Sequence, residues 1–280
     1  MKKPSSIALT LALPVLISPS VLGQLKIVYG NNAGFGPDIV EKFDVSSNPA
    51  SLLDTFSPSG GNGRGVVVVG DVAYTTVVGD PHIYKTDVNT HASLGSILTG
   101  AASMSTIAWD GSHFWTTDYT GSNRGFRIDT SGTIVKTVTF ANATGFMDGM
   151  EYFNGKLIVN RTDGGFGGPI KYDIYDTDGN LLDDDFLTAP NGTGIAFDGT
   201  NFLVSNIYGN EIGKYDGTTG AFIESISLPG SHLIEDLSVN YEERPDTGGG
   251  GVVPEASTVV SAFALTGLIG TVVWRRARSR

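Results

Sequence analysis

Acidic side chains are the residues of this sequence with the most capacity for chemistry, because the chain has no cysteine and only four histidines. Asp148 with Glu151 forms one pair, and Glu235 with Asp236 forms another. Carboxylates held close together need a cation or raised pKa values, and their oxygens suit a hard ion such as Ca²⁺. These four acids are therefore candidate ligands of a divalent metal ion. The alternative is that they are ordinary turn and surface acids.

Other kinds of catalysis have little support in the sequence. The histidines are scattered without the spacing of metal ligands, at His82, His91, His113 and His232. The sequence contains no Gly-x-Ser-x-Gly motif, no Gly-x-x-x-x-Gly-Lys loop and no His-Glu-x-x-His motif. The lack of cysteine excludes disulfides, thiolate metal sites and thiol catalysis.

An internal repeat of about 44 residues must position the acids. The segment from Ile107 to Gly111 nearly recurs from Ile195 to Gly199, 88 positions later, and a looser copy begins at Met150. A second marker recurs in step with the first, an aromatic-rich strand that ends in Asp before a Gly-containing turn. Its copies end at Asp44, Asp87, Asp129, Asp176 and Asp216. This period is typical of the blades of a β-propeller.

The clearest repeat is predicted to contain four strands, at about residues 194–198, 201–206, 211–216 and 221–228. Inner strands are expected to begin near Val66, Ile107, Met150, Ile195 and Leu237. The last of these is not followed by three further strands, whereas residues 25–30, 39–44 and 52–56 have the order of a blade's outer three. We therefore predict an all-β fold, a propeller of about five four-stranded blades in which both chain ends close one blade. An open β-sandwich is the structural alternative.

A third acidic group follows one of the recurring turns. It consists of Asp176, Asp178, Asp183, Asp184 and Asp185. Asp176 and Gly179 occupy the turn found at this place in the other repeats, and no twelve-residue calcium loop follows. The sequence therefore predicts a β-hairpin here.

The predicted propeller, residues 24–245, is strongly acidic. Outside the two terminal segments described below, 12 basic residues stand against 28 acidic residues. Such a surface repels the phosphates of nucleic acids and anionic lipid headgroups. We therefore expect no nucleic-acid partner.

The N-terminal residues 1–23 are typical of a secretory signal peptide. Lys2 and Lys3 precede an apolar stretch at residues 7–22, and Val21 and Gly23 stand before a cleavage site at Gln24. The sequence therefore predicts export. The alternative is a first buried strand.

The C-terminus carries a second targeting pattern. A Gly-rich linker at residues 246–253 precedes Pro254, Glu255, 16 largely apolar residues up to Trp274, and Arg275, Arg276, Arg278 and Arg280. A helix over the apolar residues is about 24 Å long, somewhat short of a typical hydrocarbon core. Residues 254–280 are therefore predicted to include a transmembrane helix whose arginines stop at the cytoplasmic side.

This pattern resembles the PEP-CTERM sorting signal of Gram-negative bacteria, which combines a Pro-Glu-Pro motif, a short apolar helix and an Arg cluster. Pro254 and Glu255 match the motif, and Ala256 replaces its last proline. The resemblance implies an exosortase-like processing enzyme as partner, anchoring in the inner membrane, and delivery to the cell surface or extracellular matrix. A permanent membrane anchor is the alternative.

The repeats resemble secreted propellers of the NHL-type and gluconolactonase-like families, through their Ile-Ala-Trp/Phe-Asp-Gly and Lys-Tyr-Asp segments. The segment Met147-Asp148-Gly149-Met150 is similar to a Pro-Asp-Gly-Met segment of gluconolactonase-like enzymes, and Asn191-Gly192 is similar to their Asn-Gly ligand segment. The resemblance implies that Asp148 is a metal ligand.

Two functions remain open at this point. The first is a non-catalytic exported protein whose propeller binds a protein or a polysaccharide, and the second is a metal-dependent, lactonase-like hydrolase. Among the aromatic residues Trp109, Trp115, Tyr119 and Phe126, the two tryptophans are expected to pack between blades, and Tyr119 is a candidate for stacking on sugar rings. A hydrolase requires carboxylates and an amide around one cavity, so the positions of Asp148, Glu151, Asn191 and Glu235 bear on the choice.

Overall fold

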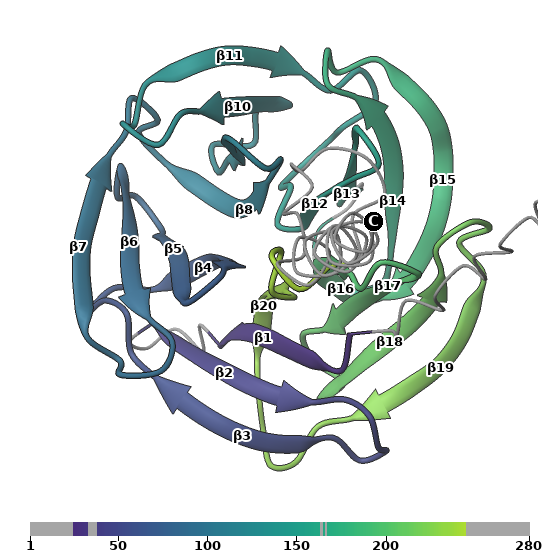
Figure 1. Ribbon diagram of the computed structural model, residues 1–280. Coiled ribbons are helices and arrows are strands. Elements are labelled where there is room, and N and C mark those ends of the chain that lie inside the picture. The colour runs from purple at the N-terminus through teal and green to yellow at the C-terminus, as the bar shows by residue number, and fades with distance from the viewer. Residues whose placement is uncertain (1–24, 33–37, 163–164, 166, 245–280) are drawn as a thin grey trace, which may run out of the picture.

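The computed structural model describes residues 25–32, 38–162, 165 and 167–244, and within them it consists of β-strands and connecting turns. Figure 1 shows the strands as five sheets around a central axis. The prediction of an all-β, five-bladed propeller is confirmed, and the open sandwich is wrong. The predicted signal peptide and the predicted sorting signal lie outside the described residues.

The described residues contain no helix long and apolar enough to cross a membrane.

Each blade is a four-stranded antiparallel sheet whose strands follow one another outward from the axis. Blade 2 comprises β4 (Gly63–Val69), β5 (Val72–Val77), β6 (His82–Asp87) and β7 (Ser93–Leu98). Blade 3 comprises β8 (Met104–Trp109), β9 (Phe114–Asp118), β10 (Arg124–Ile128) and β11 (Ile134–Thr139). Blade 4 comprises β12 (Met150–Phe153), β13 (Lys156–Arg161), β14 (Pro169–Asp176) and β15 (Leu181–Pro190). Blade 5 comprises β16 (Gly192–Phe197), β17 (Asn201–Asn206), β18 (Glu211–Asp216) and β19 (Phe222–Ser227).

Blade 1 joins the two ends of the described chain. Its inner strand is β20 (Ile234–Ser238), which pairs with β1 (Ile27–Asn32), and β2 (Ile39–Asp44) and β3 (Ser51–Phe56) lie outside them. The expectation that N-terminal strands complete the last blade is therefore confirmed. This pairing closes the ring, so that β1 is not left as an exposed inner edge.

Four inner strands begin earlier than the sequence predicts. β4, β8, β16 and β20 start at Gly63, Met104, Gly192 and Ile234, three residues before the expected positions. In each of them the register with the neighbouring strand shifts within the first four residues, as a β-bulge requires. The bulge interrupts the alternation of side chains, which is the signal that a sequence-based prediction follows.

Five hydrophobic clusters hold the ring together, one at each interface between neighbouring blades. Alternate residues of an inner strand face opposite neighbours, so Ile107 packs in the cluster of blades 2 and 3 while Ala108 packs in that of blades 3 and 4. Trp115 is fully buried in the latter, and Trp109 packs against the former, which confirms their predicted role between blades. Burial of one such side chain contributes about 1.5–3 kcal/mol.

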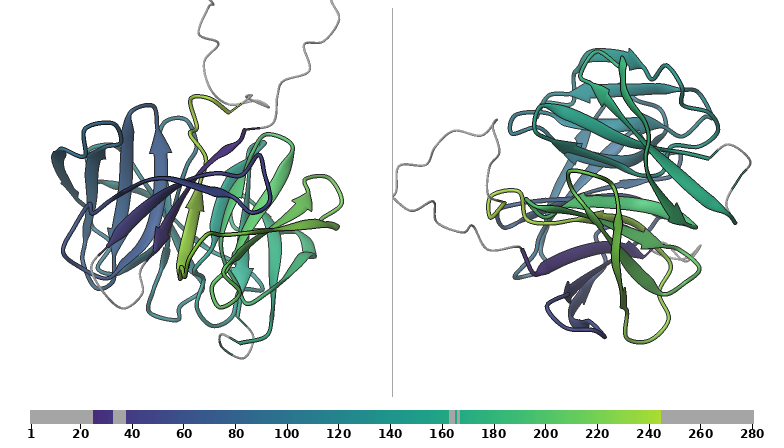
Figure 2. Two further views of the ribbon diagram at one scale, coloured as in Figure 1. Left: turned by 90° about the horizontal axis from the view of Figure 1, so that it is seen from below. Right: turned by 90° about the vertical axis from the view of Figure 1, so that its right-hand side faces the viewer.

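The two faces of the ring differ. All five inner strands begin at one face, which we call the entrance face, and β1 runs antiparallel to β20 and so begins at the opposite face. The described chain therefore starts and stops on the side away from the entrance face, as Figure 2 shows.

Candidate functional site where the inner strands begin

Five polar residues, each at the start of an inner strand or just before it, meet at the entrance face. Each lies one or two residues before the point at which regular pairing with the neighbouring strand begins. The residues are Arg64, Ser105, Asp148, Thr193 and Glu235, and we call them the mouth residues. All five are buried although all are polar, with exposed fractions of 9% or less. Polar groups from every blade therefore converge around the axis.

The bulges that position the mouth residues are held by side chains of the second strands. A bulge leaves one N–H without its partner in the sheet, and a buried N–H needs another acceptor. The N–H of Gly65 donates to Thr76 Oγ1 at 2.8 Å, and the N–H of Gly194 donates to Ser205 Oγ at 2.9 Å. Glycine is needed at both places, because a Cβ on Gly65 would lie 2.8 Å from the Ile107 nitrogen and one on Gly194 would lie 2.3 Å from Asp236 Cα.

Hydrogen bonds between neighbouring blades also fix the starts of the inner strands. Each interface has one donor side chain that reaches a backbone carbonyl of the next blade. The pairs are Asn31 to Gly65, Thr76 to Ser105, Thr117 to Met147, Tyr172 to Thr193 and Thr193 to Ile234, at 2.5–3.2 Å. The mouth is therefore a preorganised part of the fold.

Three charged residues occupy the mouth. Arg64 forms an ion pair with Glu235 at 2.7 Å, and Ser105 donates to Asp148 Oδ1 at 2.6 Å. Asp148 Oδ2 and Arg64 Nε are buried without a hydrogen-bond partner among the described residues. Two carboxyl groups thus face one guanidinium, and Asp148 and Arg64 each have one polar atom without a partner among the described residues.

Burial raises the pKa of both acids, Glu235 and Asp148. It raises the pKa of Glu235 to about 7, against the opposing effect of Arg64, and the Asp148 charge adds to the rise. Burial likewise raises the pKa of Asp148, while Ser105 and Arg64 act against the rise. At neutral pH the Glu235 carboxyl can therefore either donate or accept a proton in a hydrogen bond.

An aromatic pair lies beside these charges. Arg64 donates to the Tyr119 hydroxyl at 3.0 Å, and its guanidinium lies over the Tyr119 ring at 4.7 Å. The Phe146 ring is 5.1 Å from the Tyr119 ring, and 38% of the Phe146 side chain is exposed. The mouth therefore combines charged hydrogen-bonding groups with an accessible aromatic face.

The four acids predicted as metal ligands are separated by the fold. Asp148 and Glu235 lie together in the mouth, close enough for the Asp148 charge to affect the pKa of Glu235. Asp236 accepts from Thr106 Oγ1 at 2.9 Å and the Val66 N–H at 3.1 Å, where it links three blades. Glu151 is bound by Arg244.

Glu151 belongs to a separate buried network. It accepts a hydrogen bond from the Tyr241 hydroxyl and pairs with Arg244 at 2.9 Å. Asn191, the amide that the gluconolactonase-like resemblance singled out, donates to Asn206 at 3.3 Å. The metal hypothesis stays a prediction, and the unpartnered oxygen of Asp148 makes that residue its best candidate.

A group of three acids with metal-ligand spacing does occur elsewhere among the described residues, at Asp173, Asp184 and Asp185. Arg161 pairs with all three, at 3.0, 3.1 and 2.5 Å. A guanidinium therefore already supplies the positive charge that the acids require. The neighbouring Asp176 is a turn residue, as predicted, because its carboxylate accepts the N–H groups of Asp178 and Asn180.

No family model matches the sequence, and no curated protein matches it. Among solved structures, the chain is similar to one in "Crystal structure of Nidogen/Laminin Complex", with a TM-score of 0.52 and 13% sequence identity. The similarity covers 76% of this chain and 97% of that chain. The fold is a β-propeller. At this level of identity, the likeness shows the fold alone.

Proposed function

We propose that this chain is an exported envelope or matrix protein whose propeller binds a polysaccharide at the mouth residues. The observation that carries the proposal is the grouping of Arg64, Asp148 and Glu235 next to the ring of Phe146. Sugar hydroxyls donate and accept hydrogen bonds, which suits carboxyl and guanidinium groups, and the apolar faces of sugar rings pack on aromatic side chains. Nothing in this role requires a cofactor or a chemical step.

The structural neighbour supports an interaction role in general terms. By its title, it belongs to a complex between nidogen and laminin. A protein ligand is therefore the second class of partner for the propeller.

Export and anchoring form the second part of the proposal. Residues 1–23 direct export, and Pro254 with Glu255 directs processing by an exosortase-like enzyme after the C-terminal helix has entered the membrane. The fold supports this arrangement because β20 begins at the entrance face and the described chain stops on the opposite side of the ring (Figure 2). A tether leaving from that side would direct the mouth away from the membrane.

One observation favours a second candidate function. Asp148 corresponds by resemblance to a metal ligand of gluconolactonase-like enzymes, and its Oδ2 is buried with no partner in the part of the chain that the structure describes. A metal-dependent, lactonase-like hydrolase would bind its ion there, together with Glu235 if Arg64 moved away.

The binding proposal is tested by titrating the purified protein with soluble polysaccharide prepared from its own cells. Phe146→Ala should weaken binding about tenfold, because it removes the exposed half of the aromatic pair. Leu98→Ala serves as control, since Leu98 is 63% exposed and lies on the outer strand β7. Equal binding by Phe146→Ala and wild type would place the polysaccharide site elsewhere.

A further inference from the structure

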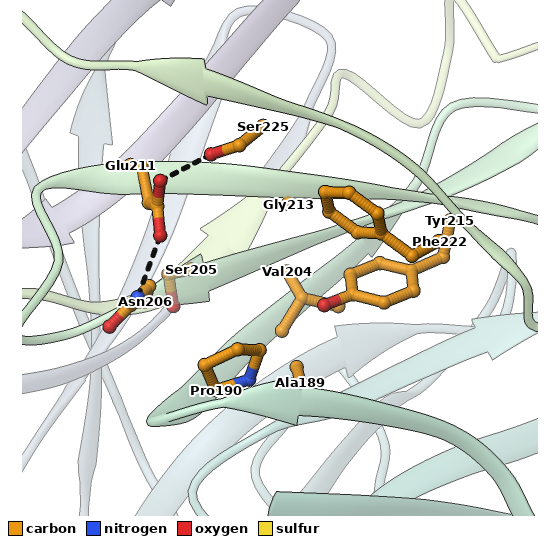
Figure 3. A pocket seen from close by; sticks show the side chains of 10 residues that line it. All are labelled: Ala189, Pro190, Val204, Ser205, Asn206, Glu211, Gly213, Tyr215, Phe222 and Ser225. Atoms are coloured by element: carbon orange, nitrogen blue, oxygen red, sulfur yellow. Dashed lines mark hydrogen bonds between the residues drawn. The ribbon is translucent and has the colours of Figure 1, made fainter. Parts of the chain in front are cut away.

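A small pocket lies between blades 4 and 5, separate from the mouth (Figure 3). Its volume is about 100 Å³. It is formed by the end of β15 and by β17, β18 and β19. The lining residues are Ala189, Pro190, Val204, Ser205, Asn206, Glu211, Gly213, Tyr215, Phe222 and Ser225. Because β17 ends and β18 begins at the entrance face, the Glu211 end of the pocket lies nearer to that face than the Tyr215 end.

One end of the pocket carries a fixed negative charge. Glu211 accepts a hydrogen bond from Asn206 Nδ2 at 2.8 Å and another from Ser225 Oγ, one on each carboxylate oxygen. Both donors are neutral, and no cationic side chain of the described residues forms an ion pair with Glu211. The carboxylate is therefore held in place, and its charge is left uncompensated.

The other end of the pocket is aromatic and aliphatic. Figure 3 shows the Tyr215 and Phe222 rings across the pocket from Glu211, with Pro190 and Val204 on a third side. The two rings are 5.5 Å apart at an angle of 70°. A Cβ on Gly213 would lie 2.8 Å from the Tyr215 ring, so glycine at this position allows the ring to lie against the strand.

The Tyr215 hydroxyl belongs to the same space. Burial raises the pKa of Tyr215 to about 12, and the charge of Glu211 adds to the rise, so the hydroxyl stays protonated and neutral. No group in the described part of the chain accepts its proton or donates to it. Glu211 and Tyr215 thus offer one charged and one neutral oxygen to a ligand.

We propose that this pocket binds the ammonium end of a lysine side chain presented by a partner protein. The ammonium would donate to Glu211 at one end of the pocket. Its methylene groups would contact Val204, Pro190 and the Tyr215 and Phe222 rings toward the other end. The acidic composition of residues 24–253, with 12 basic against 28 acidic residues, favours a basic partner.

The shape and chemistry of the pocket select this ligand among cations. Its volume of about 100 Å³ corresponds to a few water molecules, which fits an alkylammonium chain and is small for a sugar ring. A guanidinium binds best when both oxygens of a carboxylate are free to accept two parallel N–H groups. In Glu211 each oxygen already accepts a hydrogen bond, which favours the compact charge of lysine.

The test is an NMR titration of the intact protein with n-butylammonium, with n-butanol as the neutral probe of equal length. We expect saturable shifts at the lining residues with n-butylammonium, and binding of n-butanol weaker by about tenfold or more. N-butylguanidinium, the planar cation of the same length, should also bind more weakly. Equal binding of n-butylammonium and n-butanol, or shifts confined to other residues, would overturn the proposal.

Two variants and one matched control complete the test. Glu211→Gln removes the charge and should weaken n-butylammonium binding about tenfold, and Phe222→Ala, at a side chain 60% exposed, should weaken it less. Glu224→Gln removes an equal charge from the same sheet, where Glu224 pairs with Lys214 at 3.5 Å outside the pocket. An equal loss in Glu224→Gln and Glu211→Gln would show a general effect of charge and contradict the proposal. Polysaccharide binding at the mouth should be unchanged in all three variants, so the two sites can fail independently.

Discussion

At the scale of single residues, some buried carboxyl groups of this propeller have only neutral hydrogen-bond partners among the described residues. Asp38 is the clearest case. It is fully buried, and its Oδ2 accepts hydrogen bonds from Ser59 at 3.1 Å and Thr75 at 3.3 Å. Its Oδ1 has no hydrogen-bond partner among the described residues. Burial therefore raises the pKa of Asp38 from 3.8 to about 6.

The Asp38 carboxyl should make stability depend on pH. The folded protein binds this proton more tightly than the unfolded chain, so the stabilisation is complete below pH 3.8 and is lost as the pH rises through about 6. In the wild type, this carboxyl should lower the free energy of unfolding by about 2–3 kcal/mol between pH 4 and pH 8. In Asp38→Asn this contribution to the pH dependence should be absent. Urea denaturation at both pH values measures this. A stability difference between variant and wild type that is the same at both pH values would contradict the assignment.

The unpartnered Oδ2 of Asp148 allows a test that distinguishes the two candidate functions. If Asp148 holds a metal ion, millimolar Ca²⁺ should raise the melting temperature of the wild type by about 5–10 °C, through binding to the folded state alone. Asp148→Asn should lose the effect. Calorimetry with Ca²⁺ and with a chelator gives the answer. An unchanged melting temperature in the wild type would remove the metal hypothesis and most of the hydrolase alternative with it.

At the scale of elements, strand ends could be predicted where a side chain defines the turn. Asp129 is an example, because its carboxylate accepts the N–H groups of Ser131 and Thr133 and ends β10. The same chemistry recurs at the other marker aspartates. The bulges that begin the inner strands could not be predicted, because their acceptors, Thr76 and Ser205, come from a different strand.

Only part of the candidate site could be predicted from the sequence. Asp148 and Glu235 were identified because they come just before regular inner-strand pairing. Arg64 was missed as their partner, because it meets Glu235 only when β20 closes the ring beside β4, and a sequence pattern does not encode that contact. Phe146 was missed because it precedes β12 in a connection without regular periodicity.

Arg244, which follows β20, pairs with Glu151 of blade 4 and so holds the end of the described chain against the ring. A substitution of Arg244 tests how much this contact stabilises the fold. The Arg244 guanidinium is the cation that faces the fully buried Glu151 carboxylate. Arg244→Ala should therefore cost about 3 kcal/mol of unfolding free energy, because it leaves a buried charge unpaired. Glu151→Gln in the same chain should recover part of the loss. Denaturant titration of both variants is the measurement, and a single variant as stable as wild type would show that this network does not hold the closure.

At the scale of the whole molecule, the described chain starts and stops on the side of the ring away from the mouth residues. The proposed route of maturation predicts that native cells contain a chain cut near Pro254 and Glu255, without Trp274 and the terminal arginines. Mass spectrometry of the protein from native cells measures this. Replacement of Glu255 should block the cut and leave the chain in the membrane fraction. Recovery of a mature chain that still carries Trp274 would favour a permanent anchor.

The central claim is that the propeller binds a polysaccharide where the five inner strands begin. Hydrogen–deuterium exchange of the protein with and without its cell polysaccharide tests this most directly, because it maps the contact along the whole backbone. We predict slower exchange at residues 63–66, 104–107, 147–150, 192–195 and 234–236, which carry the mouth residues, and no change in the outer strand β7 (Ser93–Leu98). Protection confined to outer strands, or exchange that does not change at saturating polysaccharide, would contradict the claim.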